Sequence, residues 1–320
     1  MKHNNKTTKV ISTLMLFVLT TLAIVSCNED DAPDIDKNNG PVNYHQTAST
    51  QFIAAGQTNY AYRVLGNKAG IPLVMISALG NSMDDWDPAI TNGLAQQYKV
   101  IIFDIQGVGS SSGVTPNNIP DMASGVVAFI NALGYSKVNL MGFSMGSFIS
   151  QQIALTNPAL VNKIILTGTG PKGAEGLSNL PNILKTTVGL SPEEIFLASF
   201  FSSSPESQSA GKLSYQRIME RTVNRDAPVS PESTVAGLTA VLGWAQPYPD
   251  ALNELKGITQ PVLIAQGDND FLVQVSNAIN MSTSIPNARL IVYVDAGHGA
   301  IYQYHEKFIQ AALEFLEQTK

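Results

Sequence analysis

The sequence predicts an α/β fold in which a mostly parallel sheet is covered by helices on both faces. Short, uniformly apolar runs alternate with segments of helical periodicity along most of the chain. A strand that is apolar along its whole length is buried on both faces, which is typical of parallel sheets. The alternation stops between residues 173 and 248, where the sequence predicts helices only. This interruption indicates a helical cap (173–248) inserted between two strands.

The first 26 residues have the composition of a secretory signal peptide. Lys2, Lys6 and Lys9 precede an uncharged apolar run from residue 10 to residue 25. A basic start followed by such a run is the pattern of exported chains. The run is short for a membrane-spanning helix, and an uncleaved anchor is the alternative.

Cys27, the only cysteine of the chain, directly follows the segment LAIVS at 22–26. This segment resembles the lipobox of bacterial lipoproteins. The resemblance implies removal of residues 1–26, a lipid on Cys27, and a lipid-anchored location in the bacterial cell envelope. An ordinary signal peptide with an incidental cysteine is the alternative. With the cysteine lipidated, no thiol would remain for a disulfide or for thiol catalysis.

Residues 27–50 are expected to form an acidic, flexible tether with almost nothing to bury. His45 lies in this segment, and the pattern gives it no role. The whole chain has a formal charge of −6 at pH 7 and no basic stripe. These features argue against nucleic acid as a partner.

The first part of the folded core is expected at 51–172. A hairpin and four buried strands are predicted, at 51–55, 60–65, 73–76, 100–103, 138–141 and 163–166. Helices are predicted through Trp86, at 122–133, and after the fifth strand as far as Asn157-Pro158.

The cap and the second part of the core (249–320) follow. Ser191-Pro192-Glu193-Glu194 is a capping box that opens a helix, and Ser230-Pro231 opens another that reaches Trp244. Phe196 and Phe200 fall on one face of the first helix, and they either bury part of a substrate or pin the cap to the sheet. Two strands and a closing helix are then predicted, at 262–265, 290–294 and 308–316.

Gly142-Phe143-Ser144-Met145-Gly146 separates a predicted strand from a predicted helix. Strand, G-x-S-x-G and helix, in this order, are typical of a nucleophile elbow. A serine in so tight a turn leaves no room for a Cβ two residues away on either side, which explains the glycines. The turn would place the Ser144 hydroxyl at a helix N-terminus, where developing negative charge is favoured. We therefore predict that Ser144 is a nucleophile.

A serine nucleophile needs a base, and the base needs an orienting carboxylate. Of the four histidines, His3 and His45 lie in the signal and the tether. His298 follows a predicted strand at its C-terminal end, where parallel sheets bind ligands. His305 lies on the next helix and is expected at the surface. The sequence therefore favours His298 as the base.

The acid is expected after the preceding strand, in Gly267-Asp268-Asn269-Asp270. Spacing alone does not choose between Asp268 and Asp270. The resulting order along the chain, serine, acid and histidine, is that of the α/β-hydrolases.

The glycine-rich loop at 107–113 is not a dinucleotide fingerprint. Its third glycine is one position late, and Pro116 stands where a helix should start. The sequence indicates no metal or organic cofactor.

These motifs together resemble the α/β-hydrolase fold family, in its cofactor-free haloperoxidase and esterase branch. The resemblance covers roughly residues 51–317 and includes the cap. It implies Asp270 as the acid, because the acid of that branch ends a G-x-x-D turn. It also implies an oxyanion hole formed by the backbone N–H groups of Leu79 and Met145. The loop Ser77-Ala78-Leu79 departs from the branch by lacking the usual histidine. Since the hole uses backbone donors, activity is expected to survive.

The implied activity is hydrolysis of small to medium apolar carboxylic esters through an acyl-enzyme on Ser144. The same triad could perform perhydrolysis, cofactor-free haloperoxidation or cleavage of a carbon–carbon bond. A lipid-anchored protein that binds a small molecule without turnover is the alternative from another class. The presence of a serine, an acid and a histidine in the expected order argues against that alternative.

Overall fold

The structure is a computed structural model that describes residues 41–318. The expected signal peptide (1–26), Cys27 and the tether as far as residue 40 lie outside the described residues. Among the helices of 41–318, none has the length and apolar character needed to cross a membrane.

A single eight-stranded sheet forms the centre of the described chain, in the order β1-β2-β4-β3-β5-β6-β7-β8. Strand β2 is antiparallel to both of its neighbours, β1 and β4, and all the other pairings are parallel. The predicted fold class is confirmed, and each predicted strand is present within a few residues of its expected bounds. The strands are Gln51–Ala55 (β1), Thr58–Leu65 (β2), Leu73–Ile76 (β3), Val100–Phe103 (β4), Val138–Phe143 (β5), Val161–Thr167 (β6), Val262–Gly267 (β7) and Ala288–Tyr293 (β8).

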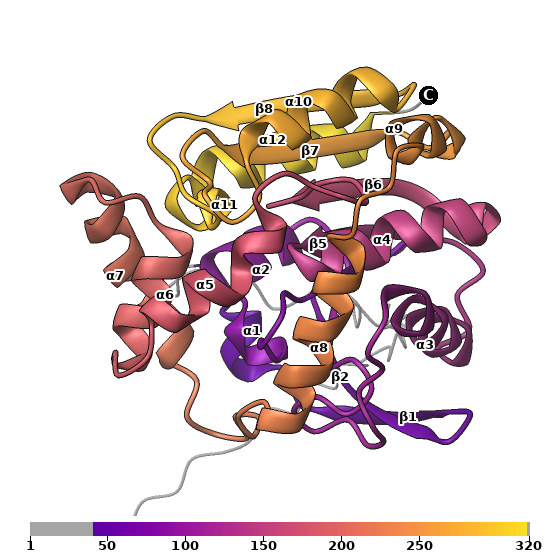
Figure 1. Cartoon of the computed structure of the whole chain (residues 1–320). Coiled ribbons are helices and arrows are strands. Elements are labelled where there is room, and N and C mark those ends of the chain that lie inside the picture. Colours follow the sequence, from indigo (N-terminus) through magenta and orange to yellow (C-terminus); the bar gives the residue numbers. More distant parts are fainter. Residues whose placement is uncertain (1–40, 319–320) are drawn as a thin grey trace, which may run out of the picture. The chain divides into compact units, whose positions relative to one another are not determined.

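Helices cover both faces of the sheet (Figure 1). Successive residues of β3 point to opposite faces: Val74 and Ile76 join one apolar cluster, and Leu73 and Met75 join the other. The first cluster is completed by α3 (Ile119–Ala132), α4 (Met145–Thr156) and α10 (Val275–Ser284). The second is completed by α2 (Pro88–Ala95), α11 (Ala300–Gln303) and α12 (His305–Glu317).

The strand order reverses between β3 and β5, which are hydrogen-bonded neighbours although β4 separates them in sequence. From β3 the chain moves outward to β4, and from β5 it moves outward in the other direction to β6. The loops that follow β3 and β5 therefore diverge at the carboxyl ends of the strands. Ligands of open α/β sheets bind at such a switch point.

Four α-helices occupy the cap (173–248) between β6 and β7. Ser191 and Ser230 cap α6 and α8 as predicted, and the reciprocal capping box at Ser191 is formed. Figure 1 shows α6 and α7 side by side, and α8 alongside α3 and α4. The cap helices are Leu180–Thr186 (α5), Pro192–Phe200 (α6), Pro205–Met219 (α7) and Pro231–Trp244 (α8).

The helix predicted through Trp86 is wrong in its extent. Met83–Asp85 forms a short 3-10 helix (η1), and Trp86 itself has an extended backbone. Asp87 explains the break, because its side chain accepts a hydrogen bond from the N–H of Ala89 and caps α2. Pro88, the first residue of α2, disfavours helical backbone in Asp87, the residue just before it, so η1 and α2 do not form one helix.

The prediction of a flexible tether is also wrong for its C-terminal part, because the described fold begins before residue 50. Tyr44–Thr47 forms a short helix (α1), and His45 is completely buried. Polar contacts hold this segment: His45 Nδ1 lies 2.9 Å from Thr91 Oγ1, and Arg221 of the cap donates hydrogen bonds to the carbonyl oxygens of His45, Gln46 and Ala48. A segment held by backbone carbonyl groups leaves no apolar pattern in the sequence, which is why the prediction failed.

Candidate active site

Ser144 lies in a sharp turn between β5 and α4, as the G-x-S-x-G pattern predicts. Its backbone has φ +53° and ψ −116°, a conformation that residues other than glycine rarely adopt. Such strain costs about 1–3 kcal/mol and persists only where the surroundings enforce it. The N–H of Ser144 donates to the carbonyl oxygen of Thr167 on β6 at 2.9 Å. The turn leaves the Ser144 side chain partly exposed at the N-terminus of α4.

Gly142 and Gly146 flank this turn because no side chain fits there. A Cβ on Gly146 would lie 2.0 Å from the carbonyl oxygen of Ile76 on β3, and a Cβ on Gly142 would lie 2.3 Å from the carbonyl oxygen of Gly146. Both obstacles are backbone atoms, which cannot move aside as a flexible side chain can. The steric reason predicted for the two glycines is confirmed.

Ser147 and Thr167 support the turn from inside, and the sequence pattern marks neither of them. Ser147 Oγ lies 2.7 Å from the carbonyl oxygen of Gly142 and accepts a hydrogen bond from the N–H of Thr167 at 3.0 Å. Thr167 Oγ1 donates to the same carbonyl of Gly142 at 3.0 Å. Both side chains are fully buried, so the strained turn is fixed by satisfied polar groups.

Asp270 and His298 meet in a buried hydrogen bond of 2.7 Å between Oδ2 and Nδ1. Asp270 Oδ2 also accepts from Gln266 Nε2 at 2.7 Å, and Oδ1 accepts from the N–H groups of Leu272 and Val273 at 3.0 and 2.9 Å. Because a carboxylate can only accept, Nδ1 of His298 carries the proton and Nε2 is left as the basic nitrogen. No hydrogen bond joins Ser144 Oγ to His298. Catalytic hydrogen bonds of enzymes without substrate are often long and tighten only in the complex.

The other candidate acid and base lie in different surroundings. Asp268 Oδ1 accepts from the N–H of Ala296 at 3.3 Å and so links the turn after β7 to the loop after β8. His305 begins α12, and its Nδ1 lies 3.3 Å from the carbonyl oxygen of Tyr302. Of the two aspartates that spacing left open, Asp270 is the one that contacts His298.

Leu79 lies on the loop that follows β3, and Met145 directly follows the turn of Ser144 after β5. Met145 is the first residue of α4, so its N–H has no acceptor within the helix. Among the backbone–backbone hydrogen bonds that residues 41–318 form in loops and turns, none has the N–H of Leu79 as its donor. Backbone donors of this kind, at the edge of a parallel sheet, can stabilise a negatively charged oxygen.

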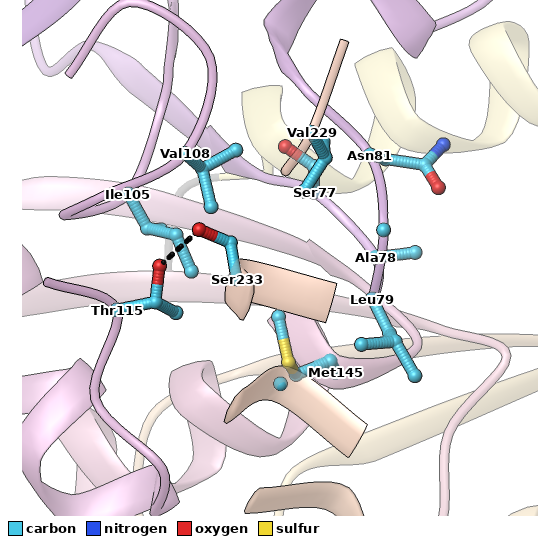
Figure 2. A pocket seen from close by; sticks show the side chains of 12 residues that line it. Ser77, Ala78, Leu79, Asn81, Ile105, Val108, Thr115, Met145, Val229 and Ser233 are labelled. Atoms are coloured by element: carbon cyan, nitrogen blue, oxygen red, sulfur yellow. Dashed lines mark hydrogen bonds between the residues drawn. The ribbon is translucent and has the colours of Figure 1, made fainter. Parts of the chain in front are cut away.

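A cavity of about 10 Å³ opens beside these two residues, beneath α8. This volume is close to the smallest that holds one water molecule. Helix α8 comes close because residue 237 is glycine: a Cβ there would lie 2.6 Å from Leu79 Cδ1. Figure 2 shows the lining residues and the 2.9 Å hydrogen bond from Thr115 Oγ1 to Ser233 Oγ. The lining includes Ser77, Leu79, Ile105, Met145, Val229 and Gly237.

The glycine-rich loop after β4 surrounds the buried side chain of Asp104. Asp104 accepts hydrogen bonds from the N–H groups of Met83 at 2.8 Å and Ser110 at 3.0 Å. A Cβ on Gly109 would lie 2.4 Å from Asp104 Oδ2, so the chain needs glycine there to approach its own carboxyl group. Burial and the neighbouring Asp226 raise the pKa of Asp104 well above its ordinary value. The Asp104 side chain therefore links η1, through Met83, to the glycine-rich loop after β4.

Comparison with known proteins gives one consistent result. The family model for the alpha/beta hydrolase fold matches residues 71–303. A solved structure of an alpha/beta hydrolase fold protein from Chitinophaga pinensis is 39% identical, with a TM-score of 0.84, and covers 87% of this chain and 100% of its own. A pimeloyl-[acyl-carrier protein] methyl ester esterase from Aliivibrio salmonicida is 28% identical over 78% of this chain and 93% of its own. A 2-hydroxy-6-oxononadienedioate/2-hydroxy-6-oxononatrienedioate hydrolase from Pseudomonas putida is 26% identical over 80% of this chain and 91% of its own.

Proposed function

The chain belongs to the α/β-hydrolase fold family, and we propose that within it the protein is a serine hydrolase acting on small to medium carboxylic esters. The observation that carries this proposal is the 2.7 Å hydrogen bond between Asp270 and His298. The pair and the strained turn of Ser144 follow three parallel strands of one sheet, β7, β8 and β5. A nucleophile, a base and an orienting acid at one sheet edge are the requirements of acyl transfer.

In the proposed mechanism Ser144 Oγ attacks the ester carbonyl carbon while Nε2 of His298 takes the hydroxyl proton. Asp270 accepts a hydrogen bond from the Nδ1–H group of His298 and so stabilises the imidazolium that forms. His298 then gives its proton to the leaving alcohol, and an acyl group remains on Ser144. A water molecule, deprotonated by the same nitrogen, attacks the acyl carbon and releases the carboxylic acid.

The N–H groups of Leu79 and Met145 are the proposed donors to the oxyanion of both tetrahedral intermediates. Loss of one such donor in other hydrolases costs about 10²–10³ in kcat. The absence of histidine from Ser77-Ala78-Leu79 is compatible with this role, because the donors are backbone groups.

The surroundings of Leu79 and Met145 bear on the polarity of the substrate. Most of the residues that line the cavity beside them are apolar. A relative is named a methyl ester esterase, which is consistent with a carboxylic ester as the substrate. These observations support an ester with an apolar group near Leu79 and Met145.

A fluorophosphonate probe tests the nucleophile, and p-nitrophenyl esters from acetate to octanoate test the substrate class. We expect the probe to label Ser144 of the wild type, and Ser144→Ala to lose both the label and about 10⁴–10⁶ in kcat. Ser124→Ala is the matched control, because Ser124 is an exposed hydroxyl on α3 that donates only to the carbonyl of Pro120.

The outcomes of this test separate the alternatives. A folded wild-type protein that takes no label would refute the proposal and favour the binding protein without turnover. A labelled protein that hydrolyses no ester would favour perhydrolysis, haloperoxidation or carbon–carbon bond cleavage by the same three residues.

We further propose that Cys27 carries a lipid that anchors the protein in the bacterial cell envelope. The segment LAIVS before Cys27 and the basic, apolar start of the chain support this. A lipid on the chain would explain membrane association without a spanning helix.

A further inference from the structure

The end of α6 packs directly against the backbone of the loop that carries His298. The N–H of Gly299 donates to the carbonyl oxygen of Phe200 at 2.7 Å. A Cβ on Gly297 would lie 2.7 Å from the same oxygen, and a Cβ on Gly299 would lie 2.9 Å from the Cβ of Phe200. The glycines on both sides of His298 are therefore explained by the cap that lies against them.

Two serines that follow α6 extend this contact to the start of the loop. The hydroxyl of Ser202 donates to Asp295 Oδ1 at 2.6 Å, and that of Ser204 donates to Oδ2. Together the two hydrogen bonds lower the pKa of Asp295. Asp295 has φ +54°, a backbone conformation that needs support. The cap thus holds the His298 loop near both of its ends.

The ring of Phe200 lies against the imidazole of His298. The two ring centroids are 5.9 Å apart, and the planes differ by 24°. Phe143, which precedes the nucleophile, lies 5.2 Å from the imidazole and 5.4 Å from the Phe200 ring. The three rings therefore meet as a triangle of one ring from the sheet, one from the cap and the imidazole.

This triangle supplies a constraint that Asp270 does not. The hydrogen bond at Nδ1 fixes one atom of the imidazole but still allows the ring to turn about that bond. Contact with the faces of neighbouring aromatic rings opposes such rotation, and aromatic pairs of this kind contribute about 0.5–1.5 kcal/mol beyond burial.

We propose that Phe200 is a positioning residue, whose ring fixes the plane of the His298 imidazole so that Nε2 is directed toward Ser144. The inference rests on the proposed serine hydrolase function. It differs from both roles that the sequence left open for Phe200, burial of substrate and attachment of the cap. The cavity beside Leu79 and Met145 is lined by α8 and by core loops, and α6 contributes nothing to it.

The test compares Phe200→Ala with Phe196→Ala. Phe196 lies one turn earlier on α6 and packs on Phe201, Tyr215 and Tyr302 as well as on Phe200, without a ring contact to His298. We expect Phe200→Ala to lower kcat by about tenfold to a hundredfold for short and long esters alike, with KM unchanged. The rate of fluorophosphonate labelling should fall by the same factor.

Conservative variants complete the test. Phe200→Tyr keeps a ring over the imidazole and should restore kcat to within about threefold of the wild type. Phe200→Leu keeps apolar volume without a ring plane, and it should lose kcat as the alanine variant does, so the test still applies if Phe200→Ala fails to fold. Phe196→Ala should lower the melting temperature and leave kcat nearly unchanged.

Two results would overturn the inference. If Phe200→Ala and Phe200→Leu keep the labelling rate and kcat of the wild type, the ring only attaches the cap. If instead Phe200→Ala raises KM relative to the wild type, and raises it more for esters with longer acyl chains, the ring binds substrate. A wild-type protein that is never labelled would refute the proposed function itself, which keeps the two failures distinguishable.

Discussion

Asp268 and Asp270 are two residues apart, but they lie in different surroundings, which suit them to different roles. Asp270 is 3% exposed and accepts hydrogen bonds from His298, Gln266 and two backbone N–H groups. Asp268 is partly exposed and accepts from the backbone of Ala296. A carboxylate with four donors is fixed in position, which is what an orienting partner for a base requires.

We expect Asp270→Asn to lower kcat by about 10⁴, because an amide cannot hold His298 in the tautomer with a basic Nε2. Asp268→Asn should cost less than about tenfold in kcat, since it only weakens a turn. Steady-state kinetics with a short ester, together with thermal melts to verify folding, measure both effects. Equal and small losses at the two positions would exclude Asp270 as the acid and make Asp295 the next residue to test.

Residue identities near the site were predictable where chemistry and chain order restricted them. Ser144 followed from its motif, and His298 from the elimination of other histidines. The choice of Asp270 needed a family resemblance, because spacing does not show which carboxyl of a turn faces inward. The supporting side chains of Ser147, Thr167 and Phe200 were not predictable, because their contacts join residues far apart in the sequence.

Helix α8 lies against the proposed oxyanion loop because its middle residue has no side chain. Gly237 leaves room for Leu79, and a Cβ at 237 would also lie 3.6 Å from Met145 Sδ. Gly243 on the same helix has no atom within 4 Å of its Cβ position. A comparison of alanine substitutions at the two glycines therefore distinguishes the effect of close approach at Gly237 from the general effect of glycine on helix stability.

We expect Gly237→Ala to lower kcat by about tenfold or more, because the new methyl group displaces Leu79 and its N–H. Gly243→Ala should leave kcat unchanged and stabilise the protein by about 0.5–1 kcal/mol, the usual gain for this substitution in a helix. Kinetics and denaturant unfolding of both variants measure these effects. Unchanged kcat in Gly237→Ala would show that α8 does not control the position of the loop.

Elements of the fold were predictable where one physical pattern governs them. Buried parallel strands such as β3, β5 and β7 are apolar at nearly every position, and their bounds follow from that run. Capping serines located α6 and α8. The sequence-based prediction missed α1, which is held by the Arg221 guanidinium. It also extended a helix through Trp86, although the capping of α2 by Asp87 ends the helical backbone there.

On the scale of the whole molecule, a buried charge network joins the first residues of the fold to the cap. Arg63 on β2 donates to both oxygens of Asp84 and to the carbonyl oxygen of Asn224. His45 Nε2 lies 3.8 Å from Asp84 Oδ1, and Arg221 Nε lies 3.6 Å from the same oxygen. Burial lowers the pKa of His45 to about 4, although the charge of Asp84 opposes the shift.

We expect this shift to make stability depend on pH. The folded His45 stays neutral down to about pH 4, whereas in the unfolded chain it takes up a proton near pH 6.5. Its contribution is therefore complete above pH 6.5 and decreases as pH falls, by about 2 kcal/mol at pH 5. The raised pKa of Asp104 acts in the opposite direction, so a comparison of variants is needed to isolate His45.

Urea unfolding at pH 7.5 and pH 5.0 measures this dependence. The loss of unfolding free energy on acidification should be smaller by about 2 kcal/mol in His45→Gln than in the wild type. His305→Gln, which alters a histidine outside the network, should retain the wild-type dependence. Identical pH dependence in all three proteins would show that His45 is not neutral in the fold.

The proposed lipid on Cys27 is a property of the whole chain. We expect the wild-type protein to partition with membranes in a bacterial host, and Cys27→Ala to be released or to accumulate unprocessed. Fractionation and mass spectrometry of the mature N-terminus measure both outcomes. A wild-type protein recovered without a lipid and without membrane association would exclude the anchor.

The contact between Arg221 and the segment before β1 determines where the chain can be shortened for recombinant work. A version that begins at Gln51, the first residue of the sheet, would lose the carbonyl oxygens of His45, Gln46 and Ala48 that accept from Arg221. Arg221 is 2% exposed, and loss of hydrogen-bond acceptors from a buried group costs about 1–3 kcal/mol. The shortest version that keeps the cap in place therefore begins upstream of Asn43, whose side chain caps α1 and accepts from Asn92 Nδ2 at 2.8 Å.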